Sequence, residues 1–234
     1  MKHNEQELRA LKAQVCEMGS LVLAQLTQTK QAFLTNDAVL ARTVISREKR
    51  VNAYELKIDR DVENYIALHT PVAVDLRLAL SLIRLSLTLE RIADFAAGIA
   101  AYIIEERTQA IDQTLCETLH VETIFSTVIT MLGEAITAFD TENTQPYKRI
   151  LEKDEAVDEI YHQAFPILAE QIKSQQLLPE QGLKLVVLMR KIERIGDHCS
   201  NMVEEIVFYV DAKVLKHHKN KHKSDAPTGE GVPL

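Results

Sequence analysis

Two stretches of the sequence carry the same pair of acids at the same spacing. Near residue 90 the chain reads LTLERIADFAAGIA and near residue 193 it reads RKIERIGDHCSNMV, so Glu90 and Asp94 recur as Glu193 and Asp197. Side chains four residues apart lie on the same face of an α-helix. Two carboxylates placed there repel each other, at a cost of roughly 0.2–0.5 kcal/mol. The spacing is typical of a solvated acidic face or of a site for a cation.

Further acids precede each pair by one predicted helix. Asp154 and Asp158 stand in DEAVD, and aligning EKDEAVDEIY with SREKRVNAYE places Glu48 opposite Asp154 and Asn52 opposite Asp158. Several carboxylates without matching cysteines or histidines form the ligand set that hard cations prefer. We therefore predict two metal sites, which take Mg, Mn or Fe ions in a divalent or trivalent state. Their ligands are Glu48, Asn52, Glu90 and Asp94 in the first half, and Asp154, Asp158, Glu193 and Asp197 in the second.

The two predicted sites differ in charge. Asn52 replaces an acid in the first site, which weakens its attraction for a cation. The first half continues on the same helical face with Glu55 and Asp59, where the second half has aromatic residues. We expect the second site to be the stronger, so that substituting Asp197 costs more bound metal than substituting Asp94.

The apolar residues around these acids form an internal repeat. From Leu78 to Ile103 they alternate spacings of four and three, which is typical of one buried face of a helix. The same series recurs about 103 residues later, from Leu185 to Ile206. A repeat of this length indicates two copies of one structural unit.

Helix-breaking residues divide the chain into six predicted helices. Pro71 and Pro179 open the third helix of each half, because proline in the first turn loses no hydrogen bond. Asn36 is the predicted N-cap of the second helix, and Pro166 should kink the fifth helix or end it early. No stretch shows the strict alternation of a half-buried strand. We therefore predict an all-α fold of two tandem three-helix bundles, up-down-up in each half. The domains are then 1–107 and 108–212, followed by a basic, disordered tail at 213–234.

Composition narrows the function. The 234 residues are 46% hydrophobic and 26% charged, and the net charge of −7 argues against a nucleic-acid partner. The hydrophilic start shows no secretory signal, and four charged residues interrupt the most apolar stretch, residues 71–90. The three cysteines form no CxxC, so we expect reduced thiols. No nucleophile elbow, P-loop or dinucleotide-binding fingerprint is present, so we predict that the chain is not an enzyme.

Two alternatives to the carboxylate metal sites stay open. Glu117 with His120, and Glu159 with His162, have the Glu-x-x-His spacing of carboxylate-bridged di-iron enzymes. Such ligands must project into the bundle core, yet the apolar series that begins at Val121 claims the core face of that helix. The other alternative is a metal-free helical interaction module whose acidic faces are solvated.

The sequence resembles the PhoU family of phosphate-signalling regulators. The resemblance rests on ERIAD and ERIGD, on TPVAVDLRLALSLIRLSLTLERIAD, on DEAVDEIY, and on LKAQVCEMGSLVLAQL near the start. It covers about residues 5 to 211. It implies two three-helix bundles related by pseudo-twofold symmetry, and surface metal clusters held by E/D-x-x-x-D motifs. The first such motif departs from the commoner form, because Ala93 stands where glycine is usual.

The resemblance also implies a function. Members regulate the high-affinity phosphate ABC transporter and hold a sensor histidine kinase in its repressing state when phosphate is plentiful. We therefore expect a cytoplasmic, metal-binding adaptor whose partners are the transporter ATPase subunit and the kinase. It would form a homodimer and reach the membrane only through these partners.

Overall fold

The computed structural model describes residues 2–106 and 112–214, and within them every regular element is an α-helix. Six long helices carry the fold, as the apolar spacing predicted. The helices are α1 (Lys2–Thr35), α2 (Ala38–His69), α3 (Ala73–Glu105), α4 (Gln113–Thr118), α5 (Val121–Thr141), α6 (Tyr147–Lys173) and α7 (Pro179–Asp211).

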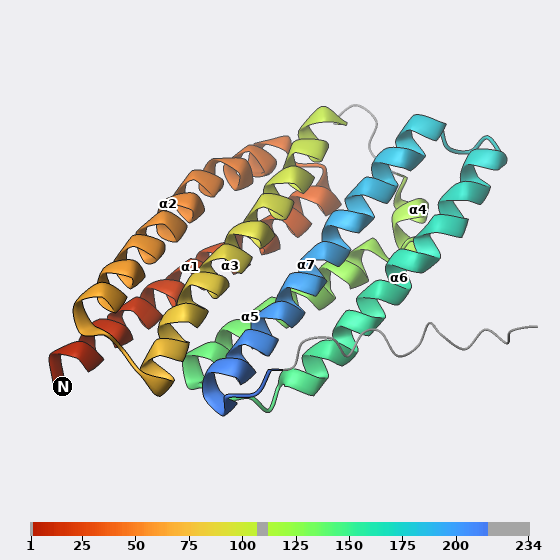
Figure 1. The fold of residues 1–234 in the computed structure, drawn as a ribbon. Coiled ribbons are helices and arrows are strands. Elements are labelled where there is room, and N and C mark those ends of the chain that lie inside the picture. Colours follow the sequence, from red (N-terminus) through yellow and green to blue (C-terminus); the bar gives the residue numbers. More distant parts are fainter. Residues whose placement is uncertain (1, 107–111, 215–234) are drawn as a thin grey trace, which may run out of the picture.

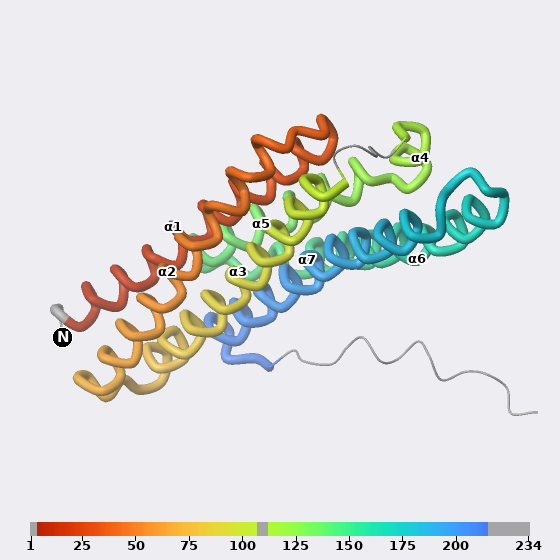
Figure 2. The backbone as a smooth tube through the Cα atoms, turned by 90° about the horizontal axis from the view of Figure 1, so that it is seen from above, coloured from red at the N-terminus to blue at the C-terminus, as the bar shows by residue number. Residues whose placement is uncertain are grey.

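The helices form two three-helix bundles that lie side by side (Figure 1). In the first, α1, α2 and α3 pack against one another, and in the second α7 packs against both α5 and α6. The halves join where α3 packs on α7 and α1 on α5, which leaves α2 and α6 on the two outer edges (Figure 1). Seen from above, α6 and α7 overlap on one side of the molecule, and α1 and α2 lie on the other (Figure 2). This arrangement confirms the predicted fold class.

The contact between α3 and α7 relates the two repeats. The Phe95 and His198 rings lie 5.7 Å apart between centroids, and these residues occupy equivalent positions, 103 residues apart. Further along, Lys191 Nζ donates a hydrogen bond to the Gly98 carbonyl at 3.0 Å. Ser81 donates to Glu205 at 2.6 Å near the other end, so the two helices run antiparallel. An approximate twofold axis therefore passes close to Phe95 and His198.

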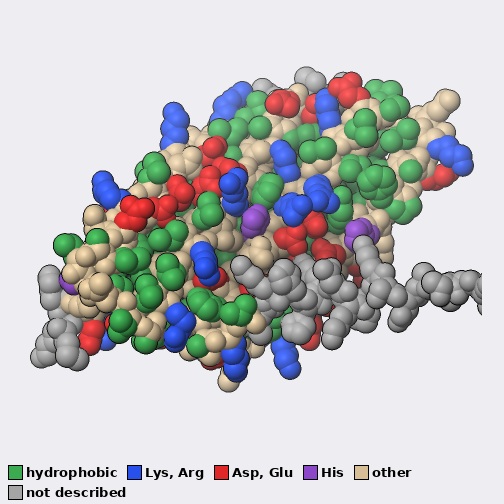
Figure 3. All heavy atoms as spheres, viewed as in Figure 1, with side chains coloured by type: hydrophobic (Ala, Val, Ile, Leu, Met, Phe, Trp, Pro, Cys, Tyr) green, Lys and Arg blue, Asp and Glu red, His purple; other side chains and the backbone are tan. Residues whose placement is uncertain are grey.

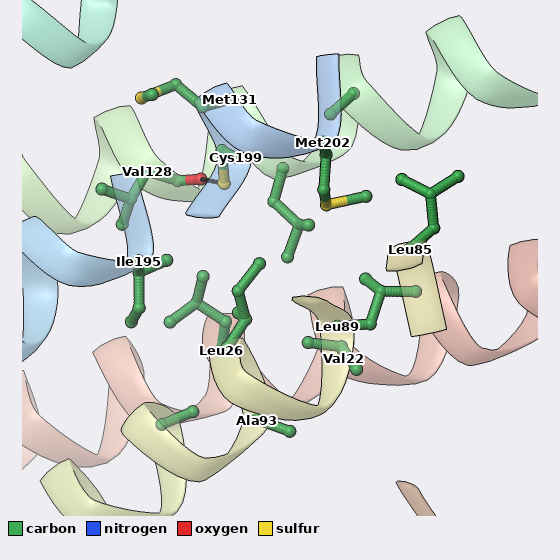
Figure 4. Close-up of a cluster of buried hydrophobic side chains, with 14 of the residues drawn as sticks. Val22, Leu26, Leu85, Leu89, Ala93, Val128, Met131, Ile195, Cys199 and Met202 are labelled. Atoms are coloured by element: carbon green, nitrogen blue, oxygen red, sulfur yellow. Dashed lines mark hydrogen bonds between the residues drawn. The ribbon is translucent and has the colours of Figure 1, made fainter. Parts of the chain in front are cut away.

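One hydrophobic core runs through both halves. In Figure 4, side chains from α1, α3, α5 and α7 converge on a common centre. Leu26, Leu89 and Ile195 are almost wholly excluded from solvent there. The Cys199 thiol also lies in this core, with Sγ 4.0 Å from the Val128 carbonyl oxygen. The halves are thus two repeats that share one apolar interior.

Several helix boundaries differ from the sequence predictions. The N-cap of α2 is Asp37, whose carboxylate accepts hydrogen bonds from the backbone amides of Val39 and Leu40. The predicted N-cap, Asn36, lies in a left-handed turn with φ 49°. Pro179 is in the first turn of α7 as predicted, but Pro71 precedes α3, whose N-cap is Val72. Helix α6 continues past Pro166 to Lys173, so this proline does not end it. The short α4 was not predicted.

Helix α5 is long and apolar enough, by length and composition, to cross a membrane. Nearly half of its most apolar window is buried, and the helix packs against α1, α6 and α7, as core helices of soluble proteins do. The predicted boundary between residues 107 and 108 lies outside the described residues. So does the predicted tail, apart from positions 213 and 214.

Candidate metal centre

Three aspartates of the second repeat converge where α6 meets α7. Asp154 and Asp158 lie one turn apart on α6, Asp197 lies on α7, and one carboxylate oxygen from each is within 4.8 Å of the others. Two oxygens bound to one Mg²⁺ or Ca²⁺ are at most twice the metal–oxygen distance apart, or about 4.2–5.2 Å. Among residues 2–106 and 112–214, this is the one group of three or more such ligands that meets the distance. The limit of 4.8 Å lies inside this range, so the three oxygens can share one hard cation.

A glycine makes room for the most buried of these aspartates. Asp154 is only 1% exposed and lies against Gly196 of the ERIGD segment. A Cβ at Gly196 would be 2.9 Å from Asp154 Oδ1 and 3.3 Å from a methyl carbon of Val157. The absent side chain therefore leaves the space that the Asp154 carboxylate occupies.

Glu193 adds a fourth carboxylate beside the three aspartates. Its Oε2 is buried and accepts no hydrogen bond from the described residues, and the Arg194 guanidinium is 4.0 Å away. Burial and the neighbouring Asp197 carboxylate raise the pKa of Glu193, and the Asp158 charge adds to the shift. A cation bound here would offset both the burial and the repulsion.

Two arginines border the second cluster, and the sequence did not predict a role for one of them, Arg190. Arg194 Nη1 is 3.4 Å from Asp197 Oδ2. Arg190, one turn before Glu193, lies with its guanidinium 5.8 Å from the centre of the Tyr161 ring. Its spacing could have revealed it, because Arg190 lies three residues before Glu193 and seven before Asp197, on the same helical face. The cluster is therefore acidic at its centre and basic at its edge.

The first repeat gathers acids at the matching boundary between α2 and α3. Burial raises the pKa of Glu90 first, and the Asp94 carboxylate raises it next. The charge of Glu55 also raises it, and Arg91 Nε is 3.7 Å from Glu90 Oε2. Burial likewise raises the pKa values of Glu55 and Asp59. The predicted ligand set contains neither residue, although both share its helical face, and the charge of Glu55 acts on Glu90.

The first cluster is looser than the second. Asn52 Oδ1 is buried and, among the described residues, has no hydrogen-bond partner, while Glu48 is half-buried. None of the predicted first-site residues belongs to a described group of three ligands within 4.8 Å. The two predicted ligand sets therefore differ in compactness as well as in charge, in the direction that the Asn52 substitution suggested.

The alternative di-iron site is not formed. Glu117, His120, Glu159 and His162 are all exposed, whereas di-iron ligands project into the bundle core. The first pair lines a pocket of about 610 Å³ between α1, α3 and α4, and the second pair lines a shallow depression on α6. Among the described residues these four do not form a ligand group. In the first pair, His120 is not even in the same helix as Glu117, because it is the N-cap of α5 with φ 51°.

Comparison with known families agrees with the duplicated architecture. The family model of the PhoU domain matches the chain twice, over residues 15–103 and 121–206. The chain belongs to the PhoU family. Both matches contain one ERIxD segment and the acids of the preceding helix, so each PhoU repeat carries its own carboxylate cluster.

Named PhoU relatives match nearly the whole chain. The phosphate-specific transport system accessory protein PhoU of Edwardsiella tarda is 33% identical over 211 residues, which is 90% of this chain and 86% of the relative. The protein of the same name from Escherichia coli (strain K12) is 32% identical over the same coverage. The crystal structure of PhoU from Pseudomonas aeruginosa superposes with a TM-score of 0.84 at 28% identity, over 89% of this chain and 99% of that one. The relatives from Edwardsiella tarda and Escherichia coli are named as accessory proteins of a phosphate-specific transport system.

Proposed function

We propose that this chain is a cytoplasmic regulator of phosphate uptake that acts as a metal-binding helical adaptor. In this proposal it modulates a phosphate ABC transporter and represses a sensor histidine kinase when phosphate is plentiful. Support comes from its relatives, which are named phosphate-specific transport system accessory proteins. The observation that carries the metal-dependent part is the convergence of Asp154, Asp158 and Asp197 within 4.8 Å.

The second repeat supplies the stronger of two metal sites. Asp154 is buried in the space that Gly196 leaves, so it provides a rigid ligand. Asp158 and Asp197 are partly exposed and leave one side of the ion open. Glu193 completes the acidic set. Mg²⁺, Mn²⁺ or an iron ion bound here would neutralise the repulsion and offer coordination positions to a partner's oxygen ligands.

The chain then acts as a rigid surface rather than as a catalyst. Its shared apolar core fixes the two clusters relative to each other, so that both can be presented to one partner. The partners in this proposal are the transporter ATPase subunit and the sensor kinase, through which the adaptor reaches the membrane. A homodimer would double the number of clusters presented.

A pull-down with the purified transporter ATPase subunit tests the metal-dependent docking. Wild-type protein loaded with Mn²⁺ should capture the subunit, and a chelator or Asp197→Asn should reduce that capture at least about tenfold, because a ligand is lost. Asp61→Asn, which removes a carboxylate on α2 that is paired with Lys57 at 2.9 Å, is the matched control. Capture that is indifferent to chelator would remove the metal from the docking step.

A second candidate is the metal-free interaction module, which the arginines favour. Arg194 is 3.4 Å from Asp197, and Arg91 is 3.7 Å from Glu90, so each cluster already has a cationic neighbour. Elemental analysis of protein purified without a histidine tag separates the two candidates. Metal that is absent even after incubation with Mn²⁺ or Fe²⁺ would favour the metal-free module.

A further inference from the structure

Exposed aliphatic side chains lie on both central helices. On α3, Leu80 and Leu87 are 37% and 45% exposed, and on α7, Leu183 and Val187 are 67% and 56% exposed. Leu183 is the repeat equivalent of Leu80. Because α3 and α7 are antiparallel, the α3 pair and the α7 pair lie on opposite sides of the contact between Phe95 and His198. Each pair is a surface that water solvates poorly.

Arginines lie on the same faces of α3 and α7 as these aliphatic side chains. The outward positions run with spacings of four, three and four on each helix, which keeps them on one helical face. We call these eight residues the outer ridge. Its members are Leu80, Arg84, Leu87 and Arg91 on α3, and Leu183, Val187, Arg190 and Arg194 on α7. Figure 3 shows basic side chains standing among hydrophobic ones over the middle of this face, with acidic groups on either side.

Each ridge arginine has a partner within the chain. Arg84 is paired with Glu205 at 3.2 Å, and its side chain is still 52% exposed. Arg91 and Arg194 face the acids of the two carboxylate clusters at 3.7 Å and 3.4 Å, and they are 56% and 46% exposed. Arg190 lies over the Tyr161 ring. Half-exposed guanidinium groups of this kind remain available for a second carboxylate.

Metal loading changes the charge of this surface. A cation that takes up the carboxylates of Glu90 or Asp197 removes the acidic neighbour of Arg91 or of Arg194. The ridge then presents four arginines and four aliphatic side chains with less competing negative charge. Arginines and apolar groups that are exposed together fit a partner helix with carboxylates beside an apolar stripe, because helix recognition uses contacts repeated every three to four residues.

We infer that the outer ridge is the docking surface for a partner helix that carries aliphatic and carboxylate side chains, and that metal binding strengthens this docking. The inference rests on the proposed function for its metal dependence. The position of the partner on α3 and α7 rests on the exposed side chains alone. The two parts can therefore fail separately.

Two ridge variants and one control test the position. Leu183→Glu/Val187→Glu adds acid to the ridge, and Arg84→Glu reverses the charge of the ridge arginine that lies away from both carboxylate clusters and is paired with Glu205. Val39→Glu/Leu68→Glu makes the same kind of change on α2, where the two side chains are 71% and 74% exposed. All five positions are exposed and none belongs to a carboxylate cluster, so the variants should keep the wild-type circular dichroism spectrum and the wild-type metal content.

The probes are a helical peptide of about 30 residues, roughly 45 Å long and so able to span the ridge, with leucines on one face and glutamates beside them, its lysine counterpart, and the transporter ATPase subunit. With Mn²⁺-loaded protein, we expect the glutamate peptide to bind at least about tenfold more tightly than the lysine peptide. Both ridge variants should lose at least about tenfold in affinity for the glutamate peptide and for the ATPase subunit, and the α2 control should stay within about twofold.

Three outcomes would overturn the inference. The first is equal binding of the two peptides, and the second is ridge variants that bind the ATPase subunit as tightly as the wild type does. The third is a dimer in sedimentation that the ridge variants convert to monomers, since the ridge would then join two copies of the chain. Loss of capture in Asp197→Asn together with normal capture by the ridge variants would leave the proposed function standing without the ridge.

Discussion

The Asp154 carboxylate on α6 packs against Gly196 on α7, in the space that a side chain at Gly196 would fill. Asp154 is almost wholly buried, and its Oδ1 is 2.9 Å from the point where a Gly196 Cβ would stand. A carboxylate is held this deeply only where the opposite helix leaves space for it. The first repeat has Ala93 in the equivalent place, where a Cβ is present. The difference between ERIGD and ERIAD therefore changes how closely an acid can approach the helix.

Gly196→Ala should weaken metal binding at the second cluster, because the new methyl group displaces the Asp154 carboxylate. Shifting a group that orients a metal site typically costs about 10–100-fold in affinity. Titration with Mn²⁺ followed by calorimetry measures the change. Gly133→Ala is the control, since its Cβ would be 3.8 Å from the nearest atom of Leu23, an ordinary contact. Equal affinities for the two variants would contradict the steric account.

Asp197→Ala should remove more bound metal than Asp94→Ala does. Asp197 belongs to the compact group of three aspartates, whereas Asp94 lies in the looser cluster, where Asn52 stands in place of an acid. Elemental analysis of both variants and the wild type, each dialysed against the same Mn²⁺ concentration, gives the two losses directly. Equal losses would mean that the two clusters bind metal equally well.

Lys12→Met should lower stability by about 0.2–1 kcal/mol near pH 7, the usual range for an exposed ion pair. Lys12 Nζ is 2.7 Å from Glu142 Oε1 and joins α1 to the end of α5. The hydrogen bond from Lys12 lowers the pKa of Glu142 below its ordinary value of 4.5. The unfolded state therefore takes up the proton first as the pH falls, and the stabilisation is lost below about pH 4.5.

Urea unfolding at several pH values measures this effect. The difference between the wild type and Lys12→Met should be constant above about pH 5 and should shrink on acidification. Lys173→Met is the control, since Lys173 is 80% exposed and 3.9 Å from Glu170. A difference that is the same at pH 3 as at pH 7 would show that the Glu142 carboxylate is not its source.

Ile195→Ala should destabilise both repeats together. Ile195 is fully buried in the core that α1, α3, α5 and α7 share, and such truncations cost about 2–5 kcal/mol. Hydrogen exchange should show that amides of α2, in the other repeat, lose protection along with those of α7. Unchanged protection in α2 would mean that the repeats unfold independently.

The sequence alone determined the helices, the repeat and the faces on which the acids lie. Apolar spacing of three and four residues follows directly from helix geometry, so the series from Leu78 to Ile103 and its copy specified two equivalent buried faces. The pair of acids on each third helix followed from the same geometry, because residues four apart share a face. The N-cap of α2 could not be predicted from the local sequence. Asn36 and Asp37 can both cap a helix, and the choice of Asp37 depends on where α1 ends.

Only the tertiary structure decided which acids meet. Carboxylates on two helices come together according to the helix separation and the axial shift between the helices, and neither quantity is encoded in the spacing within one helix. The shift brings Asp154 and Asp158 to Asp197, and it places the charge of Glu55 beside Glu90. The antiparallel packing of α3 on α7 likewise put the two repeats in one core and turned their outer stripes to the same face. Contacts between distant segments of the chain set these relations, so the periodicity of a single helix could not reveal them.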